Sequence, residues 1–483
     1  MYNRFNRIRR WAAGGAKRER PFHYQPDIEH YSRTGTTWNY DRQLGVPASM
    51  LADWATRMAS STWDTPFSKR DMRPDMGGQG GNNDLGWTTK AQSSWLISGD
   101  RRALKYMEDQ TEAAFGVPYY HKNPKYNNRW VNPVDQPWAR LAWYDSNYKE
   151  SSARNWSGNT GGWGIDTGHW GDMFTIPYLA TARRSMCDGL LGMAAFAVME
   201  KNPGQERLIP TATEADSDAG RTARLAAILN DGKGLDMRPY VQIRTTGWSE
   251  RTIAGAIALC PASETPFGDL YMRAKTGMFK RMINDEIPFA QVNQKDAYGH
   301  PMFNAWVDSE NGLASPWQAI FVIGAYIRFA RLEVPGAGTY VDWAKNYYLG
   351  GFSVANFDNA SMTKYRLRMA SSGAYHDHKS TRWNSWAGIQ AGLGSGTYGK
   401  NYEAPNAASQ ISGIGDYERR YFGLITQYWQ FLKDHGKNMA LADAAYNFTL
   451  NAPRGTTYTR ANDYYVEAQN SLVRRGQTRV GLT

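Results

Sequence analysis

Asp166, His169 and Asp172 are the residues whose types and spacing best suit acid–base chemistry. A carboxylate lies three residues to either side of the histidine, so the three side chains converge if this segment turns as a helix. One carboxylate could then orient the imidazole and leave its other nitrogen as a base or a metal ligand. The alternative is structural: His169 bonds the loop backbone, and Asp172 caps a helix that begins near Phe174.

A second group of reactive side chains lies in the segment RTTGWSERT, which runs from Arg244 to Thr252. A guanidinium such as that of Arg244 binds a carboxylate or sulfate through two parallel hydrogen bonds. The indole of Trp248 offers a flat face to a sugar ring, and Glu250 could serve as an acid. Glu250 is equally well explained as an ordinary acidic residue in the first turn of a helix.

A third polar segment carries Asp75 and Asp84, flanked by Arg73 and Trp87. We predict that Arg73, Asp75 and Trp87 bind the substrate. Two carboxylates on facing loops, about 5–9 Å apart, are what a glycoside hydrolase requires. Taken alone, Asp84 is also typical of a loop or helix cap. The sequence does not decide whether Asp84 faces Asp166 or solvent.

His376 and His378 could bind one metal ion if they lay on a strand. No third histidine or cysteine is close by in the sequence, so we predict no metal site and no cofactor. We place His376, Arg382 and Trp383 at a rim that contacts an anionic sugar. The chain has no phosphate-binding loop, no nucleophile elbow and no HExxH motif, which leaves nucleotide hydrolase, esterase and metalloprotease activities without support.

Composition favours a glycan over other partners. The chain has 19 Trp and 29 Tyr, and these side chains stack on sugar rings, although an aromatic core or protein interface would also use them. We therefore add Trp163 and Trp170 to the predicted substrate-binding residues. A net charge of +11 favours an anionic partner, above all an acidic polysaccharide. The basic residues are spread along the chain without an RNA-binding or zinc-finger signature, so nucleic acid is an unlikely partner.

Several classes of protein are excluded by what the sequence lacks. Two cysteines, Cys187 and Cys260, are too few for a disulfide framework or a zinc cluster. No stretch reaches the roughly 18 apolar residues of a membrane span, so we expect no membrane insertion. The basic N-terminus lacks the apolar centre of a secretory signal. We expect cytoplasmic synthesis, followed by incorporation into a virion or export by a route without a cleaved signal.

Helices are the elements that must position these residues, because apolar residues recur at helical spacing along most of the chain. The predicted helices are Pro47–Ser60, Trp87–Leu96, Arg102–Phe115, Phe174–Met186, Gly189–Met199, Trp248–Leu259, Leu270–Met282, Pro316–Leu332, Tyr340–Leu349, Tyr417–His435 and Met439–Leu450. The best candidate strand is Tyr240–Thr245.

The predicted helices form pairs that resemble one another. The five pairs are Arg73–Phe115, Ile165–Met199, Gly247–Met282, Ser315–Leu349 and Tyr417–Leu450. Such hairpins bury their apolar faces against their neighbours, and a stack of them stays open or closes into a ring. Long inserts at Ala114–Thr160 and Gly351–Asp416 disfavour an array of fixed repeat length.

We therefore predict an all-α fold: an α/α toroid, a complete or incomplete ring of helical hairpins with long Gly/Trp-rich loops, spanning residues 71–450. Residues 1–70 form an irregular basic arm and docking segment, and residues 451–483 form a C-terminal extension.

Three segments, Arg73–Gly99, Asp166–Leu179 and Arg244–Thr252, resemble blocks of uncharacterised bacterial and phage-encoded toroid proteins. The hairpin pattern of roughly residues 70–450 is similar to that of α/α-toroid polysaccharide lyases and six-hairpin glycosidases. The resemblance implies a central cleft, lined by the N-terminal ends of inner helices, that holds a carbohydrate chain. No signature selects one lyase or hydrolase family, and a fold does not fix the chemistry.

Two functions follow as hypotheses. In the first, the toroid cleaves an acidic polysaccharide. For elimination, His169 or Tyr178 would remove the proton next to a carboxylate, and Arg244 would neutralise the enolate. For hydrolysis, the acid and base would be two of Asp84, Asp166, Asp172 and Glu250.

In the second hypothesis, the chain is a non-catalytic virion or surface-assembly protein. Its toroid would bind host glycan or a neighbouring subunit, and its basic N-terminal arm would dock on other subunits.

Overall fold

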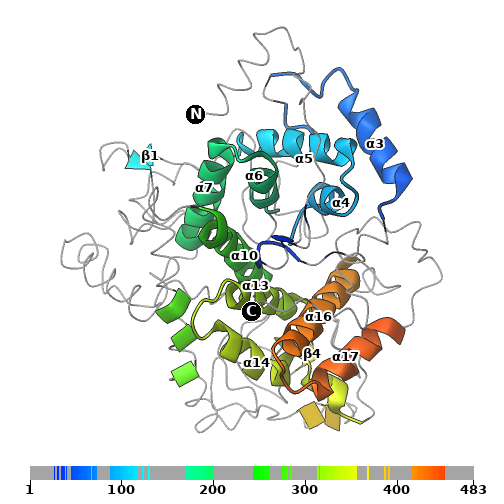
Figure 1. Cartoon of the computed structure of the whole chain (residues 1–483), viewed down its shortest axis with the longest axis vertical. Coiled ribbons are helices and arrows are strands. Elements are labelled where there is room, and N and C mark those ends of the chain that lie inside the picture. Colours follow the sequence, from blue (N-terminus) through cyan, green and yellow to red (C-terminus); the bar gives the residue numbers. More distant parts are fainter. Residues whose placement is uncertain are drawn as a thin grey trace. The chain divides into compact units, whose positions relative to one another are not determined.

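The computed structural model describes part of the chain, in segments separated by gaps (Figure 1). The described residues are 27, 30–31, 34–38, 40, 45–66, 68–72, 87–117, 122–123, 129–130, 170–200, 243–260, 275–277, 279–280, 283–284, 313–314, 316–355, 367–368, 386–387, 390–391 and 416–451. The chain divides into two compact units. Unit 1 is Met1–Leu225, Thr252–Tyr271 and Ala461–Asn470, and unit 2 is Ala226–Arg251, Met272–Arg460 and Ser471–Thr483.

Helices dominate the described part, which confirms the all-α prediction there. They are α3 (Ala48–Met58), α4 (Lys90–Ser98), α5 (Arg101–Ala114), α6 (Thr175–Thr181), α7 (Arg184–Glu200), α10 (Ile243–Leu259), α13 (Pro316–Arg331), α14 (Ala337–Tyr348), the 3-10 helix η9 (Gly350–Ser353), α16 (Asp416–Asp434) and α17 (Ala440–Asn451). The described strands are two-residue pieces in two antiparallel pairs: β1 (Lys122–Asn123) with β2 (Arg129–Trp130), and β3 (Leu313–Ala314) with β4 (Leu367–Arg368).

Unit 1 contains two helical hairpins in succession. Helix α4 packs on α5, α6 packs on α7, and α5 also contacts α6 and α3 (Figure 1). The turn between α4 and α5 is short because Gly99 ends α4 in the left-handed conformation (φ 66°) and Asp100 at once caps α5. The Asp100 carboxylate accepts a hydrogen bond from Arg102 N at 2.7 Å. The hydrogen bond from the Arg102 side chain is the main cause that lowers the pKa of Asp100.

Helix α3 packs on α5 within unit 1. Its apolar face, with Met50, Leu51, Trp54 and Met58, is buried, and the Trp54 ring stacks on Tyr106 of α5 at 4.8 Å. Burial of an aromatic pair of this kind stabilises the contact beyond the area it removes from water. Ordinary helix packing therefore holds α3 on α5.

The second hairpin has two helices where the sequence predicts one continuous helix. Phe174–Met186 is predicted as one helix, but α6 ends at Thr181 and α7 begins at Arg184. Ala182 adopts the left-handed conformation (φ 47°), and its N–H donates to Tyr178 O at 2.7 Å. The apolar pattern continues across the break because both helices bury residues in one core, so periodicity alone does not reveal the turn.

Unit 2 contains two further hairpins. Helix α13 packs on α14 and α16, α16 packs on α17, and η9 contacts α14 and α17. Tyr428 of α16 donates to Val341 O of α14 at 2.5 Å. Full burial is the main cause that raises the pKa of Tyr428 well above 10.

Four of the five predicted hairpins are therefore pairs of consecutive helices in contact. For the remaining pair, Gly247–Met282, the structure describes α10 and short helical pieces at residues 275–277 and 279–280. The predicted strand Tyr240–Thr245 is wrong at residues 243–245, which form the first turn of α10, and its other residues lie outside the described part. β-Branched residues favour strands only weakly, and here the helical packing of the following residues prevails.

None of the helices in the described part of the chain is long and apolar enough to cross a membrane.

Close packing of α10 against α13 gives a direct test of unit 2. A Cβ added at Gly247 would lie 2.7 Å from Phe321 Cβ and 2.8 Å from the backbone carbon of Phe321. Backbone atoms cannot rotate away, so we expect Gly247→Ala to lower the free energy of unfolding by about 2–3 kcal/mol. The matched control is Gly338→Ala in α14, where no atom lies within 4 Å of the added Cβ. This control should raise stability by about 0.5–1 kcal/mol.

Urea denaturation of both variants measures the two effects. Equal effects of the two substitutions would contradict the close approach of α10 to α13.

Candidate functional site

The candidate site lies in unit 1, where α4 and α6 begin. Helix α4 starts with a capping box: Thr89 Oγ1 accepts from Gln92 N at 3.3 Å, and Thr89 N donates to Gln92 Oε1 at 3.0 Å. This reciprocal pair fixes the direction in which the chain enters the helix. The segment with Asp84 immediately precedes this cap in the sequence.

Asp172 caps α6. One oxygen of its carboxylate accepts from the backbone N–H groups of Phe174 (3.2 Å) and Thr175 (3.0 Å), and the other accepts from Thr175 Oγ1 (2.5 Å). Asp172 is 1% exposed. The contacts of Asp172 are therefore those of a helix cap, as the structural alternative in the sequence analysis predicts. They hold the chain at the start of α6.

Gln92 joins the two helix starts. While its Oε1 accepts from Thr89, its Nε2 donates to Asp172 O at 2.5 Å. Thr111 of α5 makes a second link, with its hydroxyl 2.9 Å from Met173 O. Both side chains are buried, so these polar links lie away from water, where removal of a partner is costly. The N-termini of α4 and α6 are thus held side by side.

Aromatic residues pack around these helix starts. Trp87 meets Trp38 edge to face at 5.0 Å, and the neighbouring Thr88 shares a hydrogen bond with Tyr40 at 2.7 Å. Trp170 lies against Phe196 of α7 at 5.5 Å and is 1% exposed. Trp87 and Trp170, predicted to bind substrate, are buried in the described structure and fix the positions at which the two loops end.

Tyr178, predicted as a possible base, lies on α6 and is partly exposed. The other candidates from these and later loops lie outside the described residues: Arg73, Asp75, Asp84, Trp163, Asp166, His169, His376, Arg382 and Trp383.

Glu250 of α10 forms a buried ion pair within unit 2. Glu250 Oε1 accepts from Lys275 Nζ at 2.5 Å, and both side chains are 0% exposed. Glu250 was predicted from the sequence as a possible acid, whereas Lys275 was not predicted to take part. The signal that could have found Lys275 is a lysine within the apolar pattern of the predicted helix Leu270–Met282.

Trp248 and Arg251, which also lie on α10, contact aromatic rings in unit 2. The Trp248 ring stacks on Phe321 of α13 at 4.3 Å, and Arg251 Cζ lies 5.0 Å from the centre of the same ring. Arg328 donates to Arg251 O at 3.3 Å, and Arg244 is buried as well. Trp248, Glu250 and Arg251 therefore connect α10 to its neighbours in unit 2.

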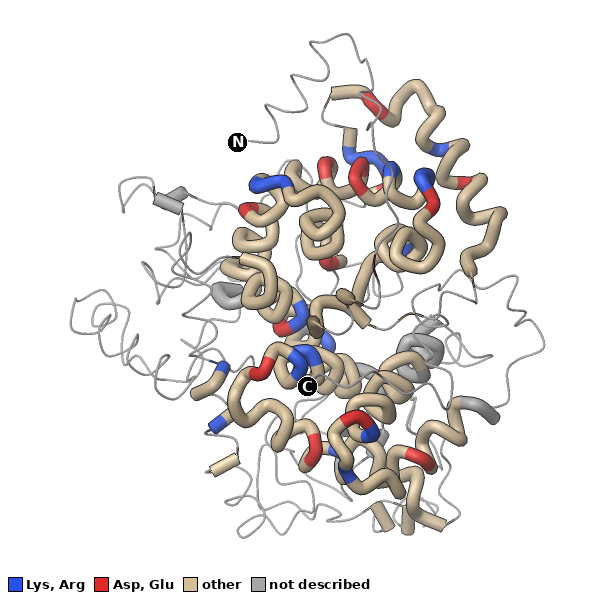
Figure 2. The backbone as a smooth tube through the Cα atoms, in the orientation of Figure 1, with Lys and Arg blue, Asp and Glu red and all other residues tan. Residues whose placement is uncertain are grey.

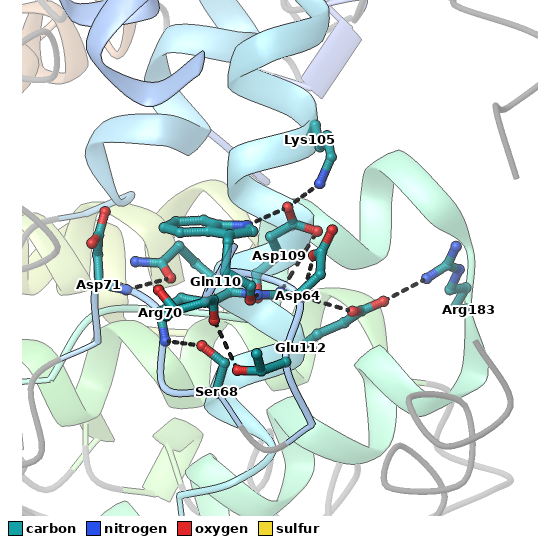
Figure 3. A network of polar contacts seen from close by, with 12 residues as sticks. Asp64, Ser68, Arg70, Asp71, Lys105, Asp109, Gln110, Glu112 and Arg183 are labelled. Atoms are coloured by element: carbon teal, nitrogen blue, oxygen red, sulfur yellow. Dashed lines mark hydrogen bonds and ion pairs between the residues drawn. The ribbon is translucent and has the colours of Figure 1, made fainter. Parts of the chain in front are cut away.

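A separate polar network in unit 1 centres on Arg70 (Figure 3). Arg70 forms ion pairs with Asp109 (3.6 Å) and Glu112 (3.5 Å), and Trp63 Nε1 donates to Asp109 at 2.8 Å. Arg183, before α7, reaches Glu112 at 3.9 Å. Acidic and basic residues occur together on α3, on α5 and in the segment between them (Figure 2). This network, which the sequence analysis missed, attaches residues 63–71 to α5.

Within the described ranges, no three His, Cys, Asp or Glu side chains gather closely enough to hold a metal ion. Comparison of the chain with protein-family models, with curated proteins and with solved structures finds no match.

The Glu250–Lys275 pair gives a prediction for stability. Removing one partner leaves a buried charge, so Glu250→Gln or Lys275→Met should each lower the free energy of unfolding by about 3–5 kcal/mol. The double variant Glu250→Leu/Lys275→Met should lose far less than the sum of the single losses, because no uncompensated charge remains.

The control cycle uses Asp53 and Arg57 on α3, whose side chains are 53% and 50% exposed. That pair should show a coupling of about 0.5 kcal/mol or less. Urea denaturation of the wild type, the two single variants and the double variant measures the free energies of unfolding. Additive losses of this free energy at Glu250 and Lys275 would show that the pair is not buried as described.

Proposed function

We propose that the protein binds and cleaves an acidic polysaccharide at the N-terminal ends of α4 and α6. The observation that carries this proposal is the hydrogen bond from Gln92 to Asp172 O, which places the starts of these helices beside each other.

Chain connectivity supports a shared site. Asp84 precedes Thr89 by five residues, and His169 precedes Asp172 by three. An extended chain spans at most about 3.6 Å per residue, which limits these intervals to about 18 and 11 Å. Asp84, Asp166 and His169 therefore belong to segments that end at one place in unit 1.

Charge supports an anionic substrate. The net charge of +11 favours the approach of an acidic polymer to the chain as a whole.

The chemistry then rests on the loop residues. For elimination, His169 removes the proton next to the uronate carboxylate, with Asp166 orienting its imidazole. For hydrolysis, Asp84 and Asp166 act as the acid and base. Asp172 positions these groups through its cap on α6. In this proposal the buried Glu250 and Trp248 hold unit 2 together and do not contact the sugar.

We propose that the hairpins close into a toroid, as the resemblance to polysaccharide lyases and six-hairpin glycosidases implies. The succession of packed helix pairs in each unit supports this arrangement.

The proposal is tested with a panel of uronate-containing and sulfated polysaccharides, following ultraviolet absorbance of unsaturated ends and the release of reducing ends. We expect product from at least one acidic polymer. Asp166→Asn should lower kcat about 100-fold or more without lowering Tm, because the loss is one of acid–base catalysis. His169→Ala should have the same effect where unsaturated ends show that the reaction is an elimination. The control Asp53→Asn removes an exposed carboxylate in the same unit and should leave the rate unchanged.

Full activity in both loop variants would contradict the site. The absence of cleavage and binding for every polysaccharide would contradict the function, and copurification of such an inactive chain within a particle would favour the assembly role instead.

A further inference from the structure

The cysteines of the chain meet in space although they are far apart in sequence. The sequence contains only Cys187 and Cys260, separated by 73 residues, and Cys187 Sγ lies 3.1 Å from Cys260 Sγ. Both residues are buried and belong to unit 1.

Helices hold both thiols in place. Cys187 lies in α7, and Cys260 directly follows α10, where its N–H donates to Ala256 O at 3.0 Å and continues the helical turn. Neither thiol therefore relies on an irregular loop for its position. The separation exceeds the length of a disulfide bond, about 2 Å, by about 1 Å, which small side-chain rotations can remove.

We propose that Cys187 and Cys260 are a built-in cross-linking site, which closes to an intramolecular disulfide when the chain meets a small-molecule disulfide such as oxidised glutathione. The bond joins α7 to the end of α10. Nothing in this proposal depends on the polysaccharide activity.

The reaction is an ordinary thiol–disulfide exchange. One cysteine thiolate attacks a sulfur of oxidised glutathione, forming a mixed disulfide and releasing one glutathione thiolate. The second cysteine thiolate then attacks the protein sulfur of the mixed disulfide, forming the Cys187–Cys260 bond and releasing a second glutathione thiolate. The two released thiolates take up the two protons that the cysteines lose. The protein is oxidised by two electrons, and oxidised glutathione is reduced to two thiols.

The cross-link should stabilise the fold, since it closes a long loop in the unfolded chain. We expect the oxidised chain to melt about 5–10 °C above the reduced chain, with the difference removed by a reductant.

The decisive experiment measures the effective concentration of one thiol at the other. The full chain is equilibrated in glutathione redox buffers, once without denaturant and once in concentrated urea. The fractions of dithiol and disulfide are read by alkylation and mass spectrometry, in which the dithiol form gains two alkyl groups and the disulfide form gains none. Equilibrium is approached from both the reduced and the oxidised chain, so slow access to buried thiols does not decide the result.

We expect the effective concentration to be at least about 100-fold higher in the native chain than in urea, because the fold holds the two sulfurs together. The controls Cys187→Ser and Cys260→Ser should form only a mixed disulfide with glutathione. Equal effective concentrations in buffer and urea, or a native chain that carries glutathione on both cysteines, would overturn the proposal.

Discussion

The amide of Gln92 is the interaction on which the candidate site depends. Its oxygen completes the cap of α4, and its nitrogen bonds the backbone at the start of α6. A buried amide that meets both needs resists rotation, because turning it would break two hydrogen bonds away from water. The starts of two helices are thereby fixed with respect to each other, and so are the ends of the loops that precede them.

Burial of charge is the second constraint on the structure. Arg70 with Asp109 in unit 1, and Lys275 with Glu250 in unit 2, are almost fully removed from solvent. A buried charge is tolerated when a partner of opposite sign lies within reach, so each pair ties its own elements together. These acids and bases are occupied in holding the helices, and reactive groups must come from elsewhere in the chain.

Helical periodicity predicted most of the described fold. The bounds of α13, α16 and α17 differ by only a residue or so from the predicted ones, since long amphipathic helices carry a strong signal. The turn at Ala182 escaped prediction because nothing in its side chain favours a left-handed conformation.

The candidate site could be predicted only in part. The spacing of Asp172 from Phe174 indicated a cap, and the structure has one. The partners Gln92 and Lys275 are distant in sequence from the residues they bond, and spacing within one segment carries no information about such contacts. Trp248 was predicted as a stacking platform for a sugar from its type alone, and in the structure its ring is buried against Phe321.

The proposed function requires that the loops before α4 and α6 contribute to one site. The most direct measurement is the distance between the carboxylates of Asp84 and Asp166 in a crystal structure of the chain with a bound acidic oligosaccharide. A shared site predicts that they lie within about 10 Å of each other, on either side of the sugar. Carboxylates about 20 Å or more apart, or an oligosaccharide bound away from both, would contradict it.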